Sequence, residues 1–100
     1  MLIGKSSKRS NLEKVRKIKR ALREVLPLPT DTLIMVTELA CIEEGCAPLE
    51  TVIGLLRPGA PQLQYKLHKP IADVEAADLV TGCVTWGFVV QASALEPFLN

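Results

Sequence analysis

The stretch from residue 37 to residue 53, TELACIEEGCAPLETVI, has the densest group of side chains in the chain that could do chemistry. Its candidate binding residues are two thiols and four carboxylates: Glu38, Cys41, Glu43, Glu44, Cys46 and Glu50. Thiolates bind soft metal ions or act as nucleophiles, and carboxylates bind hard cations or transfer protons. A simpler interpretation is a turn supplied by Gly45 and Pro48, in which the cysteines are ordinary loop and core residues.

Metal binding would require more ligands than this stretch offers. A structural zinc site has four ligands, and the chain could supply Cys41, Cys46, His68 and Cys83. The spacing between Cys41 and Cys46 suits a first ligand pair, but His68 and Cys83 are far apart and belong to different predicted elements. We therefore predict no bound metal and no cofactor.

Thiol catalysis is also disfavoured by the neighbouring charges. A reactive cysteine needs positive charge nearby to lower its pKa, whereas Glu43 and Glu44 lie next to Cys46. No set of base, nucleophile and orienting residue is recognisable in the sequence. An enzyme with Cys46 as nucleophile is therefore the least favoured of three hypotheses.

The most favoured hypothesis is a binding or accessory module whose loop, residues 38–50, contacts a protein partner or a metal.

A strongly basic amino-terminal segment supports the remaining hypothesis. Residues 1–24 carry nine Lys or Arg and two Glu, a net charge of +7, whereas residues 25–100 carry a net charge of −6. Such a segment favours contact with phosphate backbones. The candidate residues are Lys14, Arg16, Lys17, Arg20 and Arg23. No aromatic residue lies in this segment, so base stacking is not indicated, and binding would not depend on base sequence.

Two alternatives for the basic segment remain open. The cations could form a solvated helix face that pairs with the acidic remainder of the protein. They could also contact an anionic membrane surface or a partner protein.

Length and composition indicate one small domain. The chain has 100 residues, 48% of them hydrophobic and only four aromatic, so the core must consist mainly of aliphatic side chains. The first residues lack the apolar stretch of a signal peptide, and no run is long enough to span a membrane. Three cysteines, an odd number, favour reduced thiols over a disulfide framework. We expect a cytoplasmic location.

The predicted elements begin with a flexible basic arm, residues 1–9, followed by a single domain, residues 10–100. Ser10 and Glu13 have the spacing of a capping box, and an apolar stripe at helical spacing follows until Pro27. Strands are predicted at 32–40, 50–56 and 62–69, the first of them buried on both faces in its first half, with Pro58 and Gly59 turning the chain between the last two. A short helix at 74–81, with Asp73 as N-cap and Gly82 as C-cap, comes next.

This order predicts an α+β two-layer domain, α-β-β-β-α, with an antiparallel meander; a thioredoxin-like arrangement is the alternative. The apolar segment 83–100 fits either a fourth strand, residues 84–91, or another short helix. Val36, Val52 and Leu56 are expected on the sheet face that the helices leave bare. We expect the segment around Trp86 and Phe88 to cover that face or to form a homodimer contact.

Overall fold

The computed structural model describes residues 2–40 and 49–99, with side chains placed for residues 11–40 and 49–99. Its helices are α1 (Leu2–Val25), the 3-10 turn η1 (Ile71–Asp73), α2 (Ala76–Thr85) and α3 (Ala92–Leu99). Its strands are β1 (Leu33–Ala40), β2 (Leu49–Leu56) and β3 (Leu63–Leu67), which form one antiparallel sheet in the order β1-β2-β3. The predicted α+β meander is confirmed. The thioredoxin-like alternative requires a strand before the first helix, whereas the first described element is α1.

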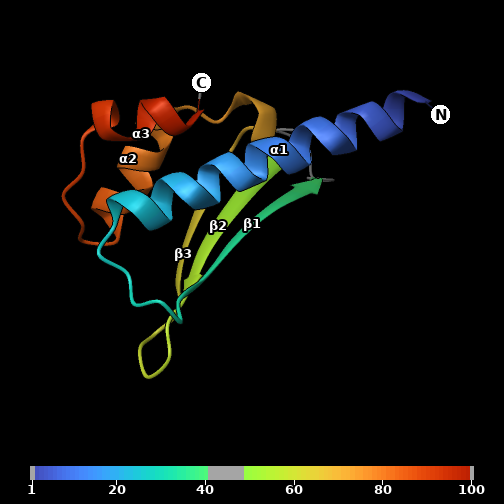
Figure 1. Ribbon diagram of the computed structural model, residues 1–100. Helices are drawn as coiled ribbons and strands as arrows, with labels where there is room; N and C mark the ends of the chain where they lie inside the picture. Colours follow the sequence, from blue (N-terminus) through green and yellow to red (C-terminus); the bar gives the residue numbers. More distant parts are fainter. Residues whose placement is uncertain (1, 41–48, 100) are drawn as a thin grey trace.

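Helix α1 crosses one face of the sheet, and α2 and α3 lie beside the carboxyl-terminal half of α1 (Figure 1). Ile18, Ala21 and Leu22 are buried under α1, in contact with the inward residues of the sheet. Pro27 and Pro29 follow the helix and end it, because proline lacks the N–H donor and keeps the residue before it out of the helical region. A turn at residues 30–31 then leads to β1. The predicted apolar stripe is confirmed from Val15 to Leu26, which share the core with Leu63, Tyr65 and Leu67 of β3. Leu12, predicted as its first member, is instead 51% exposed.

The start of α1 differs from the prediction. The helix begins at Leu2 rather than at Ser10, so the expected capping box lies inside it. No proline occurs in residues 2–9, and elongation of an existing helix fixes only one residue for each new hydrogen bond, whereas nucleation fixes three for the first. Whether residues 1–9 move independently of the domain stays a prediction.

Among the described residues, the helices cover only one face of the sheet. Along β1, Ile34 is buried and Val36 packs against the core, while Leu33, Met35 and Leu39 are 56%, 38% and 48% exposed. Alternate side chains of a strand point to opposite faces, so a single helical layer leaves every second residue in solvent. The prediction that the first half of this strand is buried on both faces is therefore wrong. Val36 was expected on the uncovered face of the sheet, and that prediction is wrong as well.

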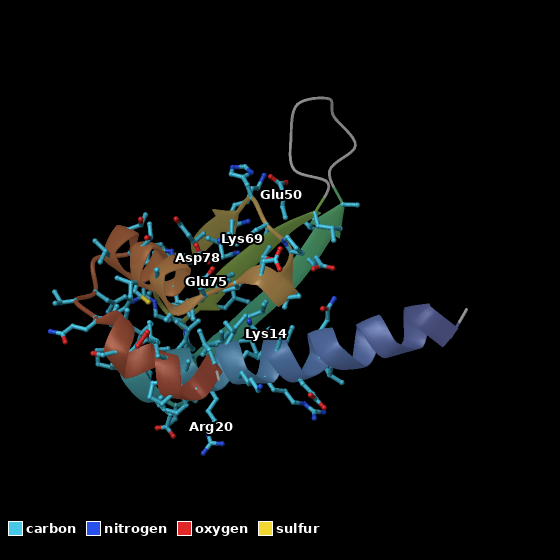
Figure 2. All side chains as sticks on the ribbon, turned by 90° about the horizontal axis from the view of Figure 1, so that it is seen from above. Lys14, Arg20, Glu50, Lys69, Glu75 and Asp78 are labelled. Carbon is cyan, nitrogen blue, oxygen red and sulfur yellow. The ribbon has the colours of Figure 1, made fainter. Side chains whose placement is uncertain are left out.

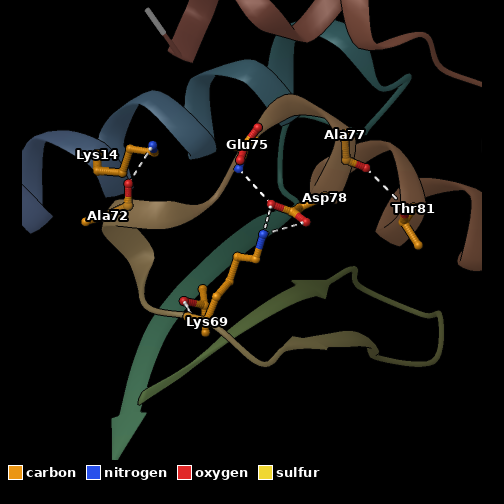
Figure 3. Close-up of polar contacts among 8 residues, drawn as sticks. Lys14, Lys69, Ala72, Glu75, Ala77, Asp78 and Thr81 are labelled. Atoms are coloured by element: carbon orange, nitrogen blue, oxygen red, sulfur yellow. Dashed lines mark hydrogen bonds and ion pairs between the residues drawn. The ribbon is translucent and has the colours of Figure 1, made fainter. Parts of the chain in front are cut away.

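Helix α2 begins two residues later than predicted. Glu75 is its N-cap, and the backbone N–H of Glu75 donates to Asp78 Oδ2 at 2.8 Å, one half of a reciprocal capping box. Asp78 also binds Lys69 Nζ, at 3.1 Å through Oδ1 and 3.0 Å through Oδ2 (Figure 3). The hydrogen bond to Asp78 is the main reason that the pKa of Lys69 is raised. Asp78 thus ties the start of α2 to the end of the meander.

The carboxyl-terminal segment packs with the helices rather than on the bare sheet face. Residues 84–91 are not a strand; α2 continues to Thr85, and α3 packs along α1 and α2 with Leu95 fully buried (Figure 1). Trp86 and Phe88 pack against the same core, so covering of the opposite face by this segment is ruled out. A homodimer through this segment stays a prediction. No helix in residues 2–40 and 49–99 is long and apolar enough to cross a membrane.

Candidate polyanion-binding site

Three of the predicted cations form a row on the outer side of α1. Arg16 and Arg20 are four residues apart, and Lys17 and Arg20 are three apart, which places neighbouring side chains on one helical face. All three are exposed, because the opposite face of the helix is buried in the core. Figure 2 shows Arg20 pointing outward from α1, away from the sheet.

The row forms one wall of a groove, and the end of α3 forms the other. The groove is lined by Arg16, Lys17 and Arg20 from α1 and by Pro97 and Phe98 from α3, and its volume is about 440 Å³. Phe98 is half-buried: it packs against the core and also lines the groove. Among the residues with placed side chains, no carboxylate lines the groove. The groove therefore combines three positive charges with an aromatic surface.

Lys14 and Arg23, the other two predicted cations, have structural contacts. Lys14 is half-buried and donates to the carbonyl oxygen of Ala72 at 3.4 Å, which ties α1 to η1 (Figure 3). It lines a separate cavity of about 320 Å³ together with Glu75 and Glu96. Lys14 therefore lies at the contact between α1 and η1 and is not part of the row. Arg23 is exposed, but its guanidinium donates to the carbonyl oxygen of Thr32 and holds the turn before β1.

None of the ion pairs among the described side chains involves the row. The ion pairs among residues 11–40 and 49–99 are Lys66–Glu50, His68–Glu50 and Lys69–Asp78, and all of them lie outside α1. Glu13 and Glu24 are the acids of α1, and neither forms an ion pair with Arg16, Lys17 or Arg20 in this set. The alternative in which the basic face pairs with the acidic remainder has no ion pair to support it among these residues.

The described members of the cysteine- and glutamate-rich stretch lie on opposite faces of the sheet. Glu38 is paired in register with Thr51, so Glu50 occupies the neighbouring position of β2 and points the other way. Glu38 accepts hydrogen bonds from the backbone N–H of Ile71 at 2.8 Å and from Asn11 Nδ2 at 3.4 Å, beneath α1. Glu50 contacts His68 Nδ1 at 2.6 Å and Lys66 Nζ at 3.7 Å on the open face.

These two glutamates are therefore not parts of one surface. Cys41, Glu43, Glu44 and Cys46, together with the turn assigned to Gly45 and Pro48, lie outside the described residues. A binding role for that loop stays a prediction.

The structure does not bring together His68 and Cys83, the two candidate zinc ligands that lie among the described residues. His68 is largely exposed on the open face of the sheet, whereas Cys83 is 1% exposed within the core on the covered face. Burial raises the pKa of the Cys83 thiol to about 11, which disfavours the thiolate that a metal or a nucleophilic reaction requires. Among the residues with placed side chains, no three His, Cys, Asp or Glu residues are grouped to hold a metal.

Sequence reasoning missed Pro97 and Phe98 as site residues. They are about 80 positions from the cations in the chain, and no spacing rule links a carboxyl-terminal helix to an amino-terminal one. A weak signal was available, because an amphipathic segment at 92–99 with its own apolar face has to pack on another part of the protein.

Models of known protein families, curated proteins and solved structures were compared with the chain, and none of them matches it.

Proposed function

We propose that this protein binds nucleic acid as a polyanion, without reading base sequence, through the groove between α1 and α3. The observation that carries the proposal is the row of Arg16, Lys17 and Arg20, exposed on one helical face of a groove that no described carboxylate lines. Cations arranged in this way displace condensed counterions from a phosphate backbone, and this release supplies sequence-independent affinity. Arg16 and Arg20 can each hold phosphate oxygens in a bidentate geometry.

An anionic membrane is a less suitable partner for the same cations. A helix that lies in a membrane interface needs a free apolar face to insert among the lipids. The apolar face of α1 is already occupied, since Ile18, Ala21 and Leu22 are at most 1% exposed. Only Leu12, at 51%, leaves a large apolar side chain of the helix in solvent among residues 11–25. Binding through charged side chains on the folded surface is therefore favoured over insertion of α1 into a membrane.

The test is a salt series with matched charge variants. Binding of a labelled random-sequence duplex and a labelled random single strand is measured by fluorescence anisotropy between about 50 and 200 mM salt. We expect affinity to fall steeply with salt. The Arg16→Gln/Arg20→Gln pair should reduce the slope of log K against log salt by about 0.9 per lost duplex phosphate contact, and by about 0.7 on a single strand.

The matched control removes the same charge from elsewhere. The Arg57→Gln/Lys66→Gln pair also lowers the net charge by two, from sites outside the α1–α3 groove. It should leave most of the affinity intact. Equal losses for the two pairs would mean that net charge, and not the groove, governs binding. Undetectable binding at about 50 mM salt would contradict the proposal itself.

We also propose a cytoplasmic location, which the state of Cys83 supports. Cys83 is a free thiol inside the core. Unpaired thiols persist in reducing compartments, whereas oxidising ones favour disulfides. Acid quenching of cells, followed by alkylation in denaturant so that buried thiols also react, should then find all three cysteines reduced.

A further inference from the structure

We infer that the α1–α3 groove selects single-stranded over duplex nucleic acid, with a base stacked on Phe98 and its neighbouring phosphates held by Arg16, Lys17 and Arg20. This inference rests on the proposed function and adds the class of nucleic acid. It follows from the position of Phe98, because the same three cations on a bare helix would bind either form.

Stacking requires a base face that is free. In a duplex both faces of each base are covered by neighbouring base pairs, so an aromatic side chain reaches one only by unstacking a step, at considerable cost. In a single strand every base offers a π-face, and stacking on an aromatic ring adds affinity with little dependence on sequence. An accessible aromatic ring beside phosphate-binding cations therefore benefits a single strand and not a duplex.

The position of α3 also disfavours a duplex. An isolated helix 10–12 Å wide fits the major groove of DNA, which is about 12 Å wide. Helix α1 is not isolated at these residues, because Pro97 and Phe98 of α3 form the second wall of the groove along the row of cations. We expect this second wall to hinder entry of α1 into the major groove of a duplex. A flexible single strand can instead follow the α1–α3 groove.

The ring of Phe98 is also held in place before any ligand binds. It packs in part against the core cluster that includes Leu95 from the same helix, so little side-chain entropy remains to be lost on stacking. The groove volume of about 440 Å³ lies within the range of roughly 300–1,000 Å³ usual for small-ligand sites. Glu96, the nearest acid in sequence, lines the separate cavity with Lys14 and not this groove. The groove thus offers one stacking surface with cations on its opposite wall.

The first experiment compares three probes on the unaltered protein at one salt concentration: a random single-stranded oligonucleotide, a duplex of the same length, and a strand of the same length with abasic sites. We expect the single strand to bind most tightly. The abasic strand should lose about 5- to 150-fold in affinity, the range that loss of one stacking contact produces.

A pair of variants tests Phe98 directly. Phe98→Leu keeps an apolar side chain for the core but removes the ring, and it should lower affinity for the intact single strand without changing affinity for the duplex or the abasic strand. Phe98→Tyr keeps the ring and should retain the preference. A thermal melt of each variant checks that the fold is intact.

The two proposals fail in different ways. Salt-dependent binding with equal affinity for all three probes would overturn the single-strand inference and leave the proposed function standing. Absence of binding to every probe would overturn both. A preference for single strands that persists in Phe98→Leu would place the stacking surface elsewhere and contradict the role of this groove.

Discussion

Gly82 of α2 lies against the ring of Tyr65 of β3, so closely that a Cβ atom added to the glycine would be 2.9 Å from Tyr65 Cδ2. This approach lets α2 sit directly on the sheet. Alanine in place of glycine normally stabilises a helix interior by about 1 kcal/mol. At this position the added methyl would push against a ring carbon close to the backbone of the strand, which has little freedom to move.

We therefore expect Gly82→Ala to destabilise the protein by roughly 1–2 kcal/mol, because overpacking exceeds the gain in helix propensity. Chemical denaturation of the single and double variants provides the measurement. In a Tyr65→Leu background the ring is absent, and Gly82→Ala should become neutral or stabilising. A higher melting temperature for Gly82→Ala alone would show that the contact between helix and sheet is looser than described.

Two apolar residues of α1 give a second, paired prediction. The side chain of Ile18 is fully buried between α1 and the sheet, whereas that of Leu12, on the same helix, is 51% exposed. Ile18→Ala should cost about 2–5 kcal/mol of unfolding free energy, since it removes buried contacts and leaves a cavity. Leu12→Ala should change it by about 0.5 kcal/mol or less. Similar losses at the two positions, measured by urea unfolding, would mean that α1 is rotated relative to the sheet.

The order of elements was predictable from the sequence because local signals carry it. The apolar stripe from Val15 to Leu26, the prolines that end α1 and the turn at Gly59 all act within a few residues of the structure they determine. Gly82 shows where such signals are ambiguous. Glycine is typical of helix ends, yet here it lies inside α2, and the reason is a tertiary contact with Tyr65 that no local pattern contains.

Half of the candidate site was predictable in the same way. Arg16, Lys17 and Arg20 share a face because of helical periodicity, which can be read from their spacing. Phe98 joins them only because α3 packs along α1, and that depends on how the whole core closes. Base stacking was not predicted, because no aromatic residue lies close to the cations in the sequence. The fold supplies that residue from the other end of the chain.

The buried thiol of Cys83 gives a prediction about pH. Its burial raises its pKa from 9.0 to about 11, because the core solvates a thiolate poorly. A group whose pKa is higher in the folded state contributes its full stabilisation below the unfolded-state pKa and loses it as pH rises towards the folded-state pKa. The difference in unfolding free energy between the wild type and Cys83→Ala should therefore be constant below about pH 9. It should shrink by roughly 2 kcal/mol at most as the pH approaches 11. A difference independent of pH up to 11 would contradict the burial of this thiol.

Labelling kinetics check the same burial at neutral pH. In a Cys41→Ser/Cys46→Ser background, Cys83 is the only thiol, so the reaction of a thiol reagent reports on it alone. Folded protein at pH 8 should react far more slowly than protein unfolded in urea, because the thiol is both inaccessible and protonated. Ile18→Ala added to this background should speed the reaction, since it weakens the core that encloses the thiol. Equal rates for folded and unfolded protein would show that α2 does not hold Cys83 in the core.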